Sequence, residues 1–188
     1  GFITLKNIKD KDVPIIKKVF FNTKGIIIDI RNYPSISIPF SLAPYFVSKT
    51  IPFAKFSRGY VDNPGEFNFY STYEIPKSKK HYRGKLVVLI NEETLSAAEF
   101  AAMAFRVGDN TTIIGSQTAG SDGNVSEIIL PGGLKTMISG IGVYYPNGQE
   151  TQRLGIIPDV VVKPTVKGIK EGRDELLEKA IEIIEKDK

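Results

Sequence analysis

The sequence contains no cysteine and a single histidine, His81. The absence of cysteine excludes disulfide bonds, thiolate metal sites and a cysteine nucleophile. With one histidine, a zinc site built from several histidines is also excluded, and any acid–base chemistry by histidine must use His81 or a residue outside this chain. No run reaches the roughly 18 apolar residues of a membrane span. No Lys/Arg-rich stretch is interleaved with aromatic residues, so nucleic-acid binding is not predicted.

What remains is the composition of an ordinary globular domain. The 188 residues are 41% hydrophobic and 24% charged, with a formal net charge of +4. This length predicts a single domain with a hydrophobic core of its own. The chain begins almost at once with a strand-like segment, Phe2 to Leu5. We therefore interpret residues 1–188 as one domain of a longer protein whose N-terminal region is absent.

Short runs rich in β-branched residues predict buried strands at Gly25–Ile30 and Leu86–Ile90, because such runs are typical of strands covered on both faces. A helix is expected over Asp12–Phe21 before the first strand, and another over Ser96–Val107 after the second. This alternation predicts an α/β fold. The other expected elements are strands at Phe2–Ile8, Thr112–Gly115, Val125–Leu130, Thr136–Ser139, Val143–Tyr145 and Asp159–Val162, and an amphipathic helix over Asp174–Lys186.

Residues 34–83 have a different character, because six prolines interrupt a stretch that is dense in phenylalanine and tyrosine. We predict an irregular, proline-rich insertion within the domain. Short strands are expected inside it at Ile51–Tyr60 and Phe67–Tyr73, with a helical turn near Leu42–Val47.

Ser96 stands where a predicted buried strand turns into a buried helix. A hydroxyl at this position lies beside the positive end of the helix dipole, with free backbone N–H groups around it. Those groups could stabilise the oxyanion of an acyl-transfer intermediate. The segment from Ser96 to Glu99 is also a capping box, in which the serine caps the helix and the glutamate reaches back. Position alone leaves both roles open.

Other polar spots are open to two interpretations as well. The glycine-rich loop Thr118–Asn124 directly follows a predicted strand, where loops commonly line sites in α/β folds, although ordinary turns have the same composition. Asp29 and Arg31 close a buried strand, which favours a structural ion pair. His81 lies in a basic run, and we expect it to be solvated.

In their order and spacing, four segments resemble the catalytic core of the C-terminal processing and tricorn-type serine peptidases. They extend over most of the chain outside residues 34–83. The resemblance implies a fold related to the Clp protease and crotonase superfamily, with stacked strand–strand–helix units, a mixed sheet and a buried helix after the nucleophile. The four segments are Gly25–Asn32, ending Asp-Ile-Arg-Asn; Val88–Glu99; Ile114–Gly123, with the pattern Gly-x-x-Thr-x-Gly; and Leu154–Val162, containing Gly-Ile-Ile-Pro-Asp.

The resemblance further implies a serine endopeptidase that hydrolyses peptide bonds through an acyl-enzyme on Ser96. By analogy, the oxyanion hole combines the N–H of Ala97 with a second N–H near Ser35. The processing proteases usually carry Gly-Gly at that second place, whereas this chain has Ser35-Ile36. Glycine's conformational freedom is therefore missing there.

The processing proteases take their general base, a lysine, from the Gly-x-x-Thr loop, and the aligned residue here is Ser121. The chain is therefore closer to the tricorn-like branch, which uses serine, histidine and a downstream glutamate. We expect Gly120 and Ser121 to line the site and a missing N-terminal segment to supply the histidine. Glu150 is the candidate to orient that histidine, unless it is only a solvated hairpin residue, and Gln152 is a competing candidate in the same stretch.

A serine without its base is a poor nucleophile, so the chain by itself is expected to be weakly active or inactive. The resemblance implies a peptide or protein substrate, no metal or other cofactor, and export to a bacterial periplasm or cell envelope. Two alternatives stay open. One is a non-catalytic peptide-binding relative in which Ser96 only caps the helix. The other is a crotonase-type acyl-CoA enzyme, which would need an adenosine-phosphate site for which no basic cluster is present.

Overall fold

The structure, a computed structural model, describes residues 1–187 and is built around a five-stranded sheet. Every neighbouring pair in this sheet is parallel, and Val88, for example, is aligned with Ile28 on one side and Ile113 on the other. In spatial order the strands are β1 (Phe2–Thr4), β2 (Gly25–Asp29), β6 (Lys85–Ile90), β7 (Thr111–Gly115) and β11 (Val160–Val161).

Successive side chains of the central strands point to opposite faces of this sheet, and both faces are covered. Ile26 and Ile28 belong to one hydrophobic cluster, whereas Ile27 between them belongs to another. Val88 and Leu89 divide in the same way. Coverage of both faces explains why these strands are continuous apolar runs rather than alternating ones.

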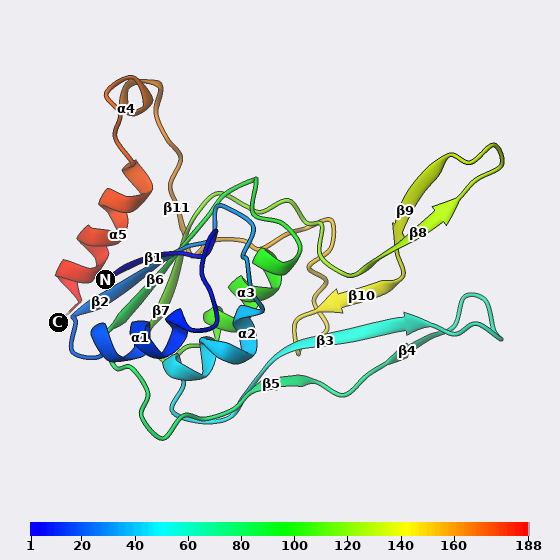
Figure 1. The fold of residues 1–188 in the computed structure, drawn as a ribbon, viewed down its shortest axis with the longest axis horizontal. Helices are drawn as coiled ribbons and strands as arrows, with labels where there is room; N and C mark the ends of the chain where they lie inside the picture. Colours follow the sequence, from blue (N-terminus) through cyan, green and yellow to red (C-terminus); the bar gives the residue numbers. More distant parts are fainter. Residues whose placement is uncertain (188) are drawn as a thin grey trace.

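Helix α3 (Ala97–Arg106) and the helices before it lie on one face of the sheet, and the C-terminal helix α5 (Glu175–Lys186) lies on the other (Figure 1). α3 supplies Ala101, Met103 and Phe105 to the first cluster, whereas α5 supplies Leu176 and Ala180 to the second. The helices are α1 (Asp12–Val19), α2 (Ile38–Ser41), the 3-10 helix η1 (Ala43–Phe46), α3 (Ala97–Arg106), α4 (Val166–Lys170) and α5 (Glu175–Lys186).

The antiparallel strands form separate small sheets. β3 pairs with three others, and β8 with β9 makes a hairpin. The hairpins β3–β4 and β8–β9 extend away from the central sheet (Figure 1). These strands are β3 (Ile51–Gly59), β4 (Phe67–Phe69), β5 (Tyr73–Ile75), β8 (Val125–Ile129), β9 (Lys135–Ser139) and β10 (Ile141–Tyr144).

The predicted α/β class is confirmed, and the structure refines it in three places. Parallel and antiparallel pairing occur in separate sheets rather than in one mixed sheet. The strand expected at Phe67–Tyr73 is divided into β4 and β5. Residues 34–83 include two short helices and three strands, and Leu42 and Phe53 from this stretch are fully buried in the main core. Among the described residues, no helix is long and apolar enough to cross a membrane.

The ion pair expected at the end of β2 is present, and it reaches further than the sequence indicated. Arg31 donates to both carboxylate oxygens of Asp29, at 3.0 and 2.8 Å, and to both of Asp174, at 3.0 and 2.7 Å. Asp174 also caps α5 by accepting the N–H of Leu177 at 3.0 Å. One guanidinium therefore fixes the start of the C-terminal helix to the carboxyl edge of the sheet.

Replacing Asp174 by alanine removes a helix cap and a partner of Arg31 at once. We expect Asp174→Ala to lower the free energy of unfolding by about 1–2 kcal/mol, since a lost cap alone costs about 1 kcal/mol and the half-exposed pair adds little. Chemical denaturation measures this change. Glu185→Ala, at an exposed position of the same helix, is the control and should leave stability within about 0.5 kcal/mol. Equal loss in both variants would contradict the assigned role of Asp174.

Candidate active site

Ser96 lies at the carboxyl edge of the sheet, in the turn that joins β6 to α3, and its backbone is strained. Its φ of 52° and ψ of −118° lie outside the extended conformation that an ordinary helix-capping residue adopts. A non-glycine residue held in such a conformation costs about 1–3 kcal/mol and persists only where its surroundings enforce it. A sharp strand–turn–helix with a serine at its apex is the geometry of a nucleophile elbow.

The turn before Ser96 is anchored by Thr94, whose side chain is fully buried. The Thr94 hydroxyl donates to the carbonyl of Ile30 and accepts the N–H of Asn91, both at 3.0 Å. The Thr94 carbonyl accepts the N–H of Ala119 at 3.1 Å. The turn is therefore joined to the end of β2 and to the loop after β7.

Glu99, in the first turn of α3, is completely buried and its carboxylate accepts four hydrogen bonds. Oε2 accepts the N–H of Ser96 at 3.0 Å, as the capping box predicts, and that of Ser121 at 2.9 Å. Oε1 accepts the N–H of Gly120 at 2.8 Å and the hydroxyl of Thr118. One carboxylate thus joins the strained serine to the glycine-rich loop.

The start of α3 leaves one backbone donor open beside Ser96. The N–H of Ala98 donates to Leu95 at 3.1 Å, whereas the N–H of Ala97 has no acceptor among residues 1–187. An unpaired N–H at a helix start is suited to an anion. The proposed second donor is differently placed: the N–H of Ser35 donates to the carbonyl of Leu5 at 3.1 Å, so it is already engaged in this conformation.

A pocket of about 370 Å³ opens at Ser96 and Ala97. Five aromatic residues contribute to its walls, among them Phe56 of β3, Tyr73 of β5 and Phe100 of α3. Besides Ser96 and Ala97, the lining residues are Tyr33, Phe56, Tyr70, Tyr73, Phe100, Asp122, Gly123, Asn124 and Ile141.

Asp122 lies in the glycine-rich loop Thr118–Asn124, which the sequence indicates as a candidate lining of the site without marking Asp122 itself. It is 7% exposed, and its Oδ1 accepts the N–H of Gly123 at 2.7 Å. Its Oδ2 is buried and has no hydrogen-bond partner among the described residues. Burial raises the pKa of the Asp122 carboxyl to about 7; the Gly123 N–H opposes this shift and the charge of Glu99 adds to it. In the sequence, an acid within a Ser-Asp-Gly segment indicates only a turn. The signal that could have marked Asp122 as a pocket residue is its place in this loop, next to the aligned Ser121.

Two of the other predicted residues, Gly120 and Gln152, lie in or beside the loop that contributes Asp122 to the pocket, and neither is among the lining residues. Gly120 has a φ of +69°, and a Cβ there would lie 2.8 Å from the carbonyl carbon of Arg153, so only glycine fits. The side-chain amide of Gln152 donates to the carbonyls of Asp122 and Ile141, at 2.8 and 2.9 Å. Gln152 therefore joins the loop to β10 and does not itself line the pocket.

Three other candidates lie away from the pocket. Ser121 is exposed, with only its N–H directed to Glu99. Glu150 is 45% exposed and pairs with the exposed Arg153 at 2.7 Å. His81 precedes β6 whereas Ser96 follows it, so the two lie at opposite edges of the sheet, a strand length of about 20 Å apart.

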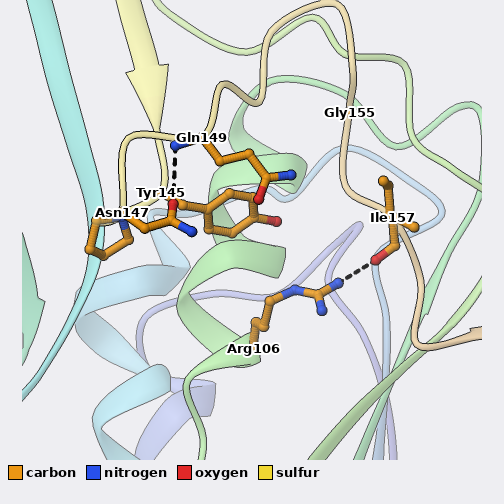
Figure 2. Close-up of a pocket in the computed structure, with 7 residues that line it drawn as sticks. Arg106, Tyr145, Asn147, Gln149, Gly155 and Ile157 are labelled. Atoms are coloured by element: carbon orange, nitrogen blue, oxygen red, sulfur yellow. Dashed lines mark hydrogen bonds between the residues drawn. The ribbon is translucent and has the colours of Figure 1, made fainter.

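A second pocket, of about 410 Å³, lies at the far end of α3 (Figure 2). There Arg106 points toward Ile157 and donates to its carbonyl, and it also pairs with Asp159 at 2.7 Å. The N–H of Gln149 donates to the side chain of Asn147 at 3.0 Å (Figure 2). The lining includes no serine, threonine or carboxylate. Ten helical residues, about 15 Å, separate this pocket from Ser96.

Fold and site together define an α/β domain with a strained serine at the carboxyl edge of its sheet. The chain belongs to Peptidase family S41, whose family model matches residues 1–162. A carboxy-terminal-processing protease of Bartonella bacilliformis is 39% identical over 79 residues, which are 42% of this chain and 18% of that protein.

Solved structures show the same fold. A Parabacteroides merdae protein provisionally described as a peptidase superposes with a TM-score of 0.86 at 24% identity, over 98% of this chain and 60% of that one. The tricorn protease superposes with a TM-score of 0.59 at 20% identity, over 98% of this chain and 17% of that one. The chain thus spans less than two thirds of these relatives.

The unpaired carboxyl of Asp122 should make the stability of the domain fall as the pH rises. The unfolded carboxyl loses its proton near pH 4, whereas the folded one keeps it until about pH 7, so the folded state binds more protons in between. Asp122→Asn, which stays neutral, should therefore match the wild type near pH 4 and be more stable by about 2–4 kcal/mol at pH 8. Denaturation at a series of pH values tests this, with the exposed Asp62→Asn as a pH-independent control.

Glu99→Gln tests the carboxylate that joins Ser96 to the loop. An amide offers one acceptor oxygen and places its N–H₂ against donors, so at least two of the four hydrogen bonds are lost. We expect a loss of about 2 kcal/mol or more in unfolding free energy, and faster hydrogen exchange at Gly120 and Ser121. The exposed Glu93→Gln is the control. Unchanged exchange at these amides would show that Glu99 does not hold the loop.

Proposed function

We propose that this chain carries the nucleophile of a serine peptidase, with Ser96 forming an acyl-enzyme with a peptide or protein substrate. The observation that carries the proposal is the strained backbone of Ser96 at the start of α3, facing a pocket beside the unpaired N–H of Ala97. Membership of a peptidase family supports it. A helix cap alone would not require a positive φ.

In this proposal the Ser96 oxygen attacks the carbonyl carbon of the scissile bond, and the amine is expelled as the tetrahedral intermediate collapses. The N–H of Ala97 donates to the oxyanion while the charge develops, and the adjoining helix dipole favours the same charge. Water then hydrolyses the ester and restores the serine. The buried hydrogen bonds of Glu99 and Thr94 keep the serine and its neighbouring N–H in place during both steps.

The proton of the Ser96 hydroxyl needs an acceptor. His81 lies at the opposite edge of the sheet and Ser121 stands where processing proteases have lysine, which supports a histidine supplied from outside residues 1–188. Glu150 remains the proposed residue to orient that histidine. To do so, its carboxylate would have to release Arg153 and bind the histidine instead. The chain alone is then weakly active or inactive. Export to a bacterial cell envelope also remains a proposal that follows from the resemblance alone.

A non-catalytic peptide-binding protein of the same fold is the second candidate. The engaged N–H of Ser35 and the position of His81 favour it, because each removes an element of a complete catalytic site from the described residues. In that case the pocket would bind a peptide, and Ser96 would have no unusual reactivity.

A fluorophosphonate applied to the full-length parent protein separates the two candidates. We expect a single adduct on Ser96, located by mass spectrometry, because an activated serine is phosphonylated far faster than an ordinary hydroxyl. Ser96→Ala should abolish labelling, whereas Ser126→Ala, at an exposed position of β8, should leave it unchanged. A folded parent protein that takes up no probe would favour the binding protein.

A further inference from the structure

Asp122 has a feature that the acyl-transfer mechanism does not use. Its carboxyl is buried, one oxygen is unpartnered among the described residues, and the residue lines the pocket that contains Ser96. A buried carboxylate without a partner is costly, and proteins normally pair such groups. Glu99, the other buried acid of this region, shows the usual outcome, since it accepts four hydrogen bonds.

The carboxyl is held firmly at this position. The N–H of Gly123 fixes one carboxylate oxygen at 2.7 Å, and Gln152 holds the backbone carbonyl of Asp122 at 2.8 Å. The second oxygen, Oδ2, has no partner among the described residues, and Asp122 lines the pocket. Because Asp122 is buried, attraction of its carboxylate to an opposite charge is stronger there than at an exposed site.

The remaining walls of the pocket are also suited to a positively charged side chain. Phe56 packs edge-on against Tyr73 at 5.0 Å between ring centroids, and its ring is tilted against that of Phe100 at 5.6 Å. Tyr33 and Tyr70 add two half-exposed rings. Aromatic faces attract cations, and they also pack against the alkyl stem of a long side chain. No lysine, arginine or histidine is among the lining residues, so the pocket itself supplies no cationic partner for Asp122.

We propose that this pocket is a substrate subsite for a lysine or arginine side chain, whose charge is bound by Asp122 and whose stem lies between the tyrosine and phenylalanine rings. An apolar side chain would leave the carboxyl unpaired, and an acidic one would be repelled by it. Since Ser96 opens into the same pocket, a side chain bound there brings its own backbone to the serine. This subsite rests on the proposed function only in taking the peptide as a substrate to be cleaved.

Binding is measured on the full-length parent protein carrying Ser96→Ala, so that no cleavage occurs. Two fluorescent peptides are compared by anisotropy; they differ only in lysine against norleucine, which has the same stem length without the charge. We expect the lysine peptide to bind about tenfold more tightly. Asp122→Asn should bring this ratio close to one by weakening the lysine peptide alone. A second neutral variant, Asp122→Ala, serves if the first does not fold.

The control is Glu127→Gln, which removes an exposed carboxylate paired with Lys135 on the β8–β9 hairpin and should keep the lysine preference. Equal binding of the two peptides, or a lysine preference that survives in the Asp122 variants, would overturn the subsite. Loss of binding of both peptides in a folded Asp122 variant would also overturn it, because that result assigns a structural role to the residue.

The fluorophosphonate probe, which carries no cationic side chain, is applied in parallel to the protein with Ser96 intact. Labelling of Ser96 without a lysine preference overturns the subsite and supports the peptidase. A lysine preference without labelling supports the cation pocket and counts against the peptidase.

Discussion

The carboxylate of Glu99 is the group on which the geometry of the site depends. It is buried at the start of α3, and its two oxygens accept from the turn that carries Ser96 and from the loop that follows β7. Those segments leave neighbouring strands of a parallel sheet at the same edge, so they lie close together but share no backbone ladder. Without a buried acceptor between them, their N–H groups would be desolvated and unpaired.

Two buried acids of this region, Glu99 and Asp122, thus differ in their hydrogen bonding. Glu99 has every acceptor site used, whereas Asp122 has one oxygen without a partner and a pKa raised to about 7. The difference follows from the hydrogen-bond donors that each contacts: Glu99 accepts from backbone N–H groups of the turn and the loop, whereas the carboxyl of Asp122 accepts only the N–H of Gly123 among the described residues. The charge of the first makes ionisation of the second harder, so the two are coupled.

The sequence predicted well what depends on local patterns. β2 and β6 were evident because both faces are buried, and the link from Ser96 to Glu99 was evident because a capping box is local in sequence. Contacts over long separations were not predictable. The bonds of Glu99 to Gly120 and Ser121, the link of Arg31 to Asp174, and the place of Asp122 all require the fold. The short helix α4 has too few apolar residues to show a period.

The strained backbone of Ser96 and the unpaired carboxyl of Asp122 both indicate a functional site at this pocket. The backbone of Ser96 and the carboxyl of Asp122 each lower the stability of the folded domain, and both line the cavity at the carboxyl edge of the sheet. Nothing in the packing of the core requires either, since a helix can begin from an extended serine and a turn can carry asparagine. Departures from local preference that bring no structural gain are expected where a protein binds or reacts.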